Sequence, residues 1–145
     1  MKNYCLLFFI LLSINAFCQS GNMQKDTTSF IEINPEFPGG IKAFYKYINQ
    51  NFNYPKSAIK AGYMGRVIVK FIIEKDGRVK IDNINSSEMV FRRKKATEEL
   101  RQLAIKEMIV AITNHYESMP IWKPGTQNGT PVRVFFTTPL YLEFQ

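Results

Sequence analysis

The run from Arg66 to Val79 constrains the fold of this chain more than any other part of its sequence. β-Branched and aromatic residues dominate Arg66 to Glu74, and apolar side chains alternate with charged ones, which is the pattern of a half-buried strand. The predicted core face of this strand consists of Val67, Val69, Phe71 and Ile73. Lys75-Asp76-Gly77 follows as a tight-turn signal, because glycine adopts positive φ without steric cost. Val79 and Ile81 then continue the buried face on a returning strand, so the run predicts an antiparallel hairpin without any residue suited to catalysis.

Two helical segments are predicted before this hairpin. The first follows the turn at Pro38-Gly39-Gly40, and its apolar side chains recur at helical spacing: Ile41, Phe44, Tyr45, Ile48 and Phe52. Pro55 begins the second segment, with Ala58 and Ile59 facing inward. Gly62 is placed to end it in a left-handed conformation.

The segment after the hairpin predicts a turn and then a long helix. Asn85 to Glu88 is polar and turn-like, and Met89 to Phe91 either begins the helix early or forms a separate turn. A helix is predicted from Ala96 to Asn114 with Thr97 as its N-cap. Between Pro120 and Pro124 the chain is extended, and Trp122 is interpreted as a buried plug, with an exposed partner anchor as the alternative.

The last predicted strand, Val132 to Phe144, carries the main candidate binding site. The apolar face of this strand is regular, and Pro139 lies within the strand. A proline cannot donate a ladder hydrogen bond, so this strand is expected at an edge of the sheet, where a guest strand can pair with it. The candidate partner-binding residues are Val132, Val134, Phe136, Thr138, Leu140 and Leu142.

The N-terminus predicts export. Lys2 precedes the apolar stretch Leu6 to Phe17, and Ala16-Phe17-Cys18 resembles a cleavage site. We therefore expect a signal peptide over residues 1–18, a flexible lead over 19–33 and one domain over 34–145, because 145 residues with 46% hydrophobic content suit a single core. Acylation of Cys18 and an uncleaved anchor are the alternatives. The expected location is periplasmic or associated with the outer membrane.

The residues that could support an enzyme are few. Cys5 and Cys18 both lie in the targeting segment, so the mature chain would lack a thiol. His115 is the only histidine, and at the end of a predicted helix it is expected to be solvated or a capping residue. No zinc motif, phosphate-binding loop or carboxylate constellation stands out. We therefore expect no enzyme, no catalytic residue, no metal and no cofactor.

Basic residues suggest a second type of partner. The chain has a formal net charge of +7, and part of the excess is concentrated at Arg92, Arg93, Lys94 and Lys95. Such a run is either a solvated helix start or a surface for an anionic envelope component, a lipid headgroup or a glycan. For an exported protein, nucleic acid is not an expected partner.

Several motifs occur in an order that resembles the C-terminal domain of TonB proteins, in the version common in Bacteroidetes. The motifs that carry the resemblance are Pro35 to Gly40, Tyr54-Pro55 with Ala58, Gly65-x-Val67-x-Val69-x-Phe71, Asp76-Gly77-x-Val79, Trp122 to Gly125 and Gly129-x-Pro131-Val132-x-Val134. The resemblance covers Asn34 to Gln145. The chain departs from the family pattern between Met89 and Ser118, where its segment before the tryptophan motif is longer than the family usually has. The role of this segment stays open.

The resemblance implies a small α+β fold in which a three-stranded antiparallel sheet packs against helices. Domains of this kind take part in TonB-dependent transmembrane transport by adding a segment of an outer-membrane transporter to the sheet, usually beside the last strand. For this chain, that implies a protein partner in the cell envelope and a contact strand from Val132 to Phe144. Pairing of two copies through open edge strands is the alternative.

Overall fold

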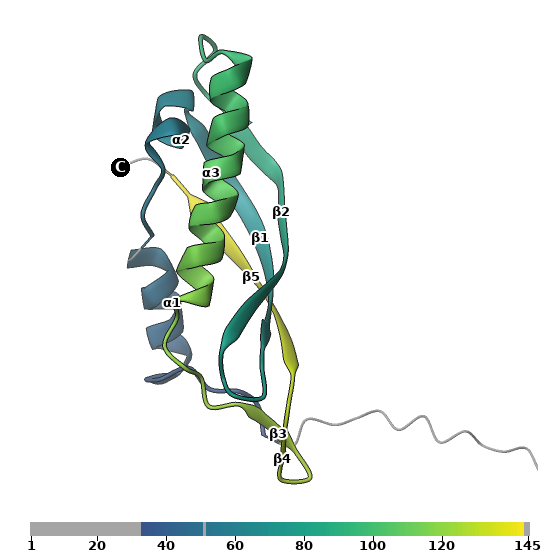
Figure 1. The fold of residues 1–145 in the computed structure, drawn as a ribbon. Helices are drawn as coiled ribbons and strands as arrows, with labels where there is room; N and C mark the ends of the chain where they lie inside the picture. Colours follow the sequence, from purple (N-terminus) through teal and green to yellow (C-terminus); the bar gives the residue numbers. More distant parts are fainter. Residues whose placement is uncertain (1–32, 51, 144–145) are drawn as a thin grey trace, which may run out of the picture.

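The structure is a computed structural model, and it describes residues 33–50 and 52–143. Its elements, in chain order, are α1 (Gly40–Gln50), α2 (Lys56–Ala61), β1 (Tyr63–Ile73), β2 (Val79–Phe91), α3 (Glu98–Glu117), β3 (Gly125–Gln127), β4 (Thr130–Val132) and β5 (Val134–Leu142) (Figure 1). The predicted signal peptide over residues 1–18, and the lead up to residue 32, lie outside the described residues.

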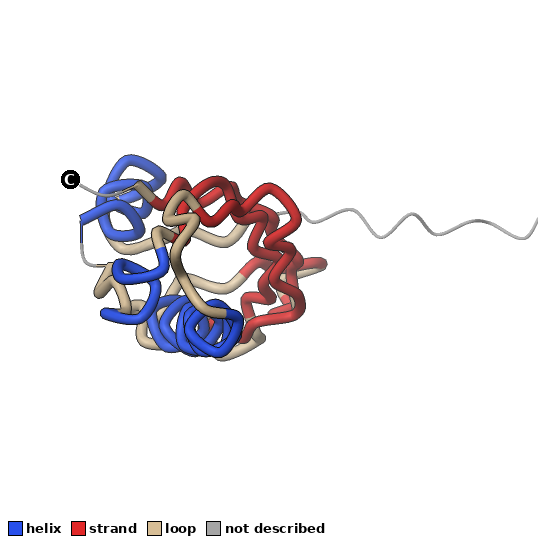
Figure 2. The backbone as a smooth tube through the Cα atoms, turned by 90° about the horizontal axis from the view of Figure 1, so that it is seen from above, coloured by secondary structure: helices blue, strands red, loops and turns tan. Residues whose placement is uncertain are grey.

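A three-stranded antiparallel sheet, which the family resemblance implies, forms the centre of the fold, and its strand order is β2-β1-β5. Seen along the long axis of the molecule, strands occupy one side and helices the other (Figure 2). The helix α3 runs along the sheet, and the short strands β3 and β4 form a second, two-stranded sheet at one end (Figure 1). The fold is therefore α+β, with one layer of helices against one sheet.

The predicted hairpin is confirmed as β1 and β2. The predicted core face of β1, from Val67 to Ile73, is fully buried, and Gly77 at the turn has φ +82°. The turn predicted over Asn85 to Glu88 is wrong, because β2 continues through it to Phe91 and pairs with β1 as far as Tyr63. This part of β2 pairs with β1 while most of its polar side chains are exposed. A strand therefore forms here without the alternation of apolar and polar residues by which a strand is recognised in a sequence.

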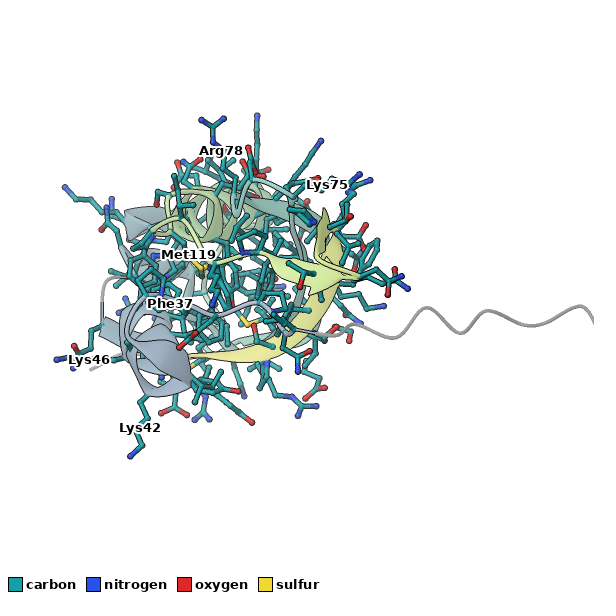
Figure 3. The ribbon with its side chains drawn as sticks, turned by 90° about the horizontal axis from the view of Figure 1, so that it is seen from below. Phe37, Lys42, Lys46, Lys75, Arg78 and Met119 are labelled. Atoms are coloured by element: carbon teal, nitrogen blue, oxygen red, sulfur yellow. The ribbon has the colours of Figure 1, made fainter. Side chains whose placement is uncertain are left out.

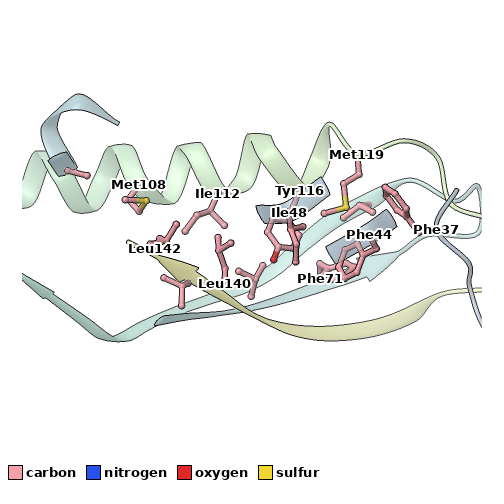
Figure 4. Packing of buried hydrophobic residues seen from close by; sticks show 14 of the residues in the cluster. Phe37, Phe44, Ile48, Phe71, Met108, Ile112, Tyr116, Met119, Leu140 and Leu142 are labelled. Carbon is pink, nitrogen blue, oxygen red and sulfur yellow. The ribbon is translucent and has the colours of Figure 1, made fainter. Parts of the chain in front are cut away.

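An aromatic cluster between α1, the sheet and the chain after α3 forms one end of the core. Trp122 is 3% exposed, and its ring centroid lies 5.2 Å from that of Phe37 and 5.1 Å from that of Phe44. Phe71 of β1 completes this contact. Towards the other end, Met108 and Ile112 of α3 pack over the strands (Figure 4). The interpretation of Trp122 as a buried plug is confirmed.

The helices present a narrower buried stripe than the sequence predicts. Phe44 and Ile48 of α1 are buried, whereas Ile41 is 58% exposed and Tyr45 is 46% exposed. Ile59 of α2 is also exposed, contrary to its prediction. Each helix is buried along one narrow side only, α1 towards the core and α2 mainly towards α3, and these three side chains lie outside that side. The predicted caps are confirmed, since Gly62 is left-handed and the Thr97 hydroxyl accepts a hydrogen bond from the Leu100 amide.

The last predicted strand is divided in two. Val132 belongs to β4, where it pairs with Gly125, and the chain then leaves this small sheet at Arg133 before β5 begins. The turn between β3 and β4 has positive φ at Asn128 and Gly129, the conformation that a two-residue hairpin turn requires. The guanidinium of Arg133 donates to the Glu74 carboxylate at 2.8 Å, at the point where the two sheets meet. The prediction of one continuous strand from Val132 is therefore wrong.

Candidate functional site: the free edge of β5

The strand β5 lies at an edge of the three-stranded sheet. It pairs with β1 over nine consecutive positions, from Gly65 opposite Leu142 to Ile73 opposite Val134, without a register shift. Pro139 stands opposite Ile68 inside this uninterrupted register. The edge position that Pro139 predicts is thus confirmed, and the other side of β5 pairs with no strand among the described residues.

The six predicted partner-binding residues do not share the position expected of them. Val132 lies in β4, and the other five alternate along the inward face of β5. Val134, Thr138, Leu140 and Leu142 are buried, and Phe136 is half-buried. The side chains of these five residues therefore belong to the core, and only their backbone can take part in pairing at the edge.

The outward positions of β5 carry the exposed side chains that the sequence analysis missed. Phe135 is 67% exposed and Tyr141 is 59% exposed, with Thr137 and Pro139 between them. Two aromatic rings on the solvent side of an edge strand are unusual, because large apolar side chains there favour pairing with another chain. The sequence contains a signal for this outer face. Phe135 and Tyr141 alternate with the apolar core positions of the predicted strand, and a strand that serves only the core does not need aromatic residues there.

A buried polar contact fixes the middle of β5. The Thr138 hydroxyl lies 3.0 Å from the Tyr116 hydroxyl of α3, and both side chains are buried. Burial raises the pKa of Tyr116 to about 12, so its hydroxyl stays protonated and can share a hydrogen bond with Thr138. The strand is therefore held to the helix layer at its centre, which keeps its outer edge in place.

A groove borders the C-terminal half of β5. It has a volume of about 390 Å³ and is lined by the end of α1, the segment leading into α2, and the end of β5. The lining residues are Ile48, Asn49, Gln50, Phe52, Tyr54, Ile59, Leu140, Tyr141, Leu142 and Glu143. Tyr141 and Ile59 both line this depression, whose walls carry polar as well as apolar groups, so it can receive a side chain that arrives beside β5.

The other edge of the same sheet, β2, is built differently. Its pairing with β1 contains two register shifts. Ser86 and Ser87 together stand opposite Val67, and Asp82 is an extra residue between Ile81 and Asn83 that has no partner on β1. Bulges bend and twist an edge strand, and exposed charged residues hinder pairing with another chain. The bulges and charged side chains therefore protect the edge of β2 from pairing with another chain, whereas the edge of β5 is regular.

The predicted basic residues, Arg92 to Lys95, form the turn between β2 and α3 at one end of the molecule (Figure 1). All four are exposed. The turn lies beside the end of α2, where the Arg92 amide donates to the Gly62 carbonyl at 2.9 Å. This turn lies at one end of the long axis of the molecule, away from the middle of β5 (Figure 1). The two candidate sites predicted from sequence are therefore separate.

His115 is packed inside the helix layer, contrary to its prediction as a solvated or capping residue. It is 8% exposed, and its ring stacks on Tyr47 with centroids 5.0 Å apart and an interplanar angle of 12°. Burial lowers the pKa of His115, because the protonated ring would lose its hydration. The ring borders a separate cleft of about 610 Å³ along α3. Its Nε2 is buried without a hydrogen-bond partner in the part of the chain that the structure describes.

Two further features of the described residues bear on the class of site. In this part of the chain, no group of three or more His, Cys, Asp or Glu side chains lies close enough to hold a metal ion. None of the helices in this part of the chain is both long enough and apolar enough to cross a membrane.

The structure is thus a small α+β domain whose sheet has one regular edge, β5. Residues 50–104 match the family described as the Gram-negative bacterial TonB protein C-terminal. Over this range the chain is similar to TonB C-terminal domains, a non-enzymatic class of domain that interacts with proteins of the cell envelope and is associated with transport. The matched range spans α2, β1, β2 and the start of α3, and β5 lies outside it. No curated protein and no solved structure matches the chain.

Proposed function

We propose that this protein binds an extended segment of a cell-envelope protein, an outer-membrane transporter in the first instance, by pairing it with the free edge of β5. One observation carries the proposal: β5 offers nine residues in unbroken register at the edge of the sheet. A guest strand needs such a regular row of backbone donors and acceptors, because main-chain hydrogen bonds provide the affinity in strand addition.

Pro139 indicates which backbone groups face the guest. A proline is tolerated in a strand where its missing N–H would point away from the neighbouring strand. Since the ladder with β1 is uninterrupted at Pro139, its nitrogen points to the free edge. Residues two apart along a strand direct their N–H groups to the same side. We therefore assign the amides of Phe135, Thr137 and Tyr141 to the guest strand.

Side chains around the edge supply specificity. Phe135 and Tyr141 stand at the two ends of the exposed face of β5, and the 390 Å³ groove begins beside Tyr141. A guest with apolar residues at alternate positions, which share one face of a strand, fits these two aromatic side chains.

The proposed setting follows from the sequence and the family. A signal peptide over residues 1–18 would deliver the domain over 34–145 to the periplasm or to the outer membrane, with residues 19–33 as a lead. The partner is then a transporter segment that reaches the periplasm. The domain would act by binding alone, without a catalytic step.

The substitution Thr137→Pro tests the proposal. It removes one assigned amide from the free edge and leaves the predicted ladder with β1 intact. Thr137→Val is the matched control, because it changes the same exposed side chain and keeps the N–H. Each tagged variant is incubated with detergent-solubilised envelope, and captured proteins are identified by mass spectrometry. We expect wild type and Thr137→Val to capture outer-membrane transporters and Thr137→Pro to lose them.

Equal capture by Thr137→Pro and wild type would overturn strand addition at β5. Circular dichroism checks that both variants fold. A wild-type protein that elutes as a dimer, and becomes monomeric only with Thr137→Pro, would show instead that a second copy of the chain occupies the edge.

A further inference from the structure

We propose that the turn between β2 and α3 is a second, independent binding surface, and that it docks on the anionic phospholipid headgroups of a bilayer. The surface consists of Arg92, Arg93, Lys94 and Lys95 together with Lys60 and Val90, and is called the basic tip below. The proposal does not depend on strand addition at β5, which uses other residues.

The basic tip concentrates unpaired positive charge. Lys60 in the last turn of α2 and the four residues of the turn are all exposed. Within the described residues, the three ion pairs involve Arg66, Arg78 and Arg133, and none involves the tip. The nearby acidic residues are Glu98 and Glu99, which begin α3, where they interact favourably with the helix dipole. Five basic side chains against two acidic ones leave a clear positive excess.

The turn is fixed in place, so its side chains are presented together. The Arg92 amide donates to the Gly62 carbonyl at 2.9 Å, and the Ala96 amide donates to the Arg93 carbonyl at 3.1 Å. A Cβ atom at Gly62 would lie 2.8 Å from the Arg93 nitrogen, so α2 and the turn approach each other closely. Below the turn, Phe91 stacks on Tyr63 with centroids 4.5 Å apart. Because the backbone of the turn is already ordered, binding costs no ordering of this segment.

Shape and an exposed apolar side chain favour a bilayer over a soluble polyanion. The turn protrudes at one end of the long axis, where a flat surface can approach without meeting the rest of the molecule (Figure 1). Val90, at the end of β2, is 52% exposed. Basic residues attract an anionic surface, and an adjacent apolar side chain gains further by entering the interfacial region. A soluble polyanion would use the charges but not Val90.

The opposite end of the molecule provides a matched control. Lys75 and Arg78 lie at the turn between β1 and β2 and project outward from that end (Figure 3), and Lys80 follows on β2. All three are exposed. The triple variant Arg92→Glu, Lys94→Glu, Lys95→Glu and the triple variant Lys75→Glu, Arg78→Glu, Lys80→Glu change the net charge by the same amount at different places. Arg93 is kept because its backbone and side chain contact Gly62.

Vesicle co-sedimentation of the full chain tests the basic tip. The probes are vesicles of phosphatidylethanolamine with phosphatidylglycerol, and vesicles of phosphatidylcholine alone. Each basic side chain near an anionic surface contributes a factor of about five, so reversing three at the tip should lower partitioning by roughly 100-fold or more. The control triple variant should lose less than about tenfold, through net charge alone. We expect little binding to phosphatidylcholine.

Two results would overturn the proposal. The first is equal loss in the two triple variants, which would mean that net charge and not the tip is responsible. The second concerns Val90→Ser, which should weaken vesicle binding about fivefold and leave binding to inorganic polyphosphate unchanged. If Val90→Ser has no effect on vesicles, and polyphosphate competes fully for the protein, the tip binds polyanions in general and not a lipid surface. Capture of transporters by the tip variant stays normal, so failure here is distinguishable from failure of the proposed function.

Discussion

The two edges of the sheet, β2 and β5, differ in the regularity of their pairing and in the side chains that they expose. Both edges border the same central strand β1. The edge of β2 has thirteen residues with two register shifts, and its exposed side chains include Asp82 and Lys80. The edge of β5 has nine residues in unbroken register, with Phe135 and Tyr141 exposed. Regularity and exposed aromatic rings, more than edge position, distinguish a binding edge from a protected one.

Pro139 adds a limit to the open edge. A strand with all its amides free is a site for uncontrolled association. Pro139 removes one donor from the middle of the free edge while the ladder with β1 continues on both sides of it. The edge of β5 is thus suited to a short guest segment and less suited to extended pairing between copies.

The inward and outward sides of β5 should differ most in their effect on stability. Leu140 is 2% exposed and packs in the core, so Leu140→Ala should lower the free energy of unfolding by about 2–5 kcal/mol. Tyr141→Ala, one residue further, should change it by less than about 0.5 kcal/mol. Urea unfolding followed by circular dichroism measures both. A large loss of stability with Tyr141→Ala would mean that the outward face is structural.

The same outward residue should matter for binding. Exposed aromatic side chains that become buried at an interface often contribute about 2 kcal/mol or more. We therefore expect Tyr141→Ala to weaken capture of the partner by about tenfold or more, as measured by titrating immobilised envelope protein. Val90→Ala at the end of β2 should leave this capture unchanged, and a similar loss with both would remove the distinction between the edges.

Acidification should loosen the β5 side of the molecule before the β2 side. The pKa of His115 is lowered by burial in the native state, and its ring stacks on Tyr47 of α1, which flanks β5. The unfolded state therefore binds more protons as the pH falls from about 7 to about 5, so the stability contributed by the neutral ring is present above the ordinary histidine pKa and is lost below it. Hydrogen exchange in α1 should accelerate more than exchange in β2.

His115→Gln provides the control for this effect. Glutamine stays neutral over the same pH range, so the acceleration in α1 should disappear in the variant. An unchanged pH dependence in His115→Gln would assign it to other groups.

The bulges of β2 should matter least for stability but should affect association. Deleting Asp82 joins Ile81 to Asn83 and restores one regular stretch of pairing with β1 at Lys70 and Phe71. We expect the variant to fold and to form more dimer at high concentration, because a flatter edge pairs more readily. Analytical ultracentrifugation measures the change, and a fully monomeric variant would show that the bulge does not protect this edge.

The sequence predicted those elements whose local pattern and tertiary role agree. The hairpin of β1 and β2 was recognisable because β-branched and aromatic residues dominate β1 and a turn signal follows it, and the core face from Val67 to Ile73 is fully buried. Pro139 predicted the edge position of β5 because the missing amide excludes a central strand. Trp122 was recognisable as core because its flanking prolines and glycine leave no regular element to expose it.

Other features depend on contacts between distant segments. The outer half of β2, from Asn85 to Glu88, is a strand only because β1 continues beside it, and its polar sequence carries no such signal. The burial of His115 depends on Tyr47 and Phe52, which lie more than sixty residues earlier in the chain. At the candidate site, the sequence predicted the edge position of β5 and selected its inward side chains as the binding residues. The choice followed apolarity, which marks the core, whereas binding at an edge uses the opposite face.

Site-specific photocrosslinking tests the central claim most directly. A photoreactive phenylalanine replaces Tyr141 on β5 in one variant and Asn83 on β2 in another, and both are irradiated in cells that produce the protein. Both positions are exposed, so the two variants differ in the edge that they report. The account predicts crosslinks to an outer-membrane transporter from position 141 and none from position 83. Crosslinks from position 83 alone, or equal crosslinks from both positions, would contradict it.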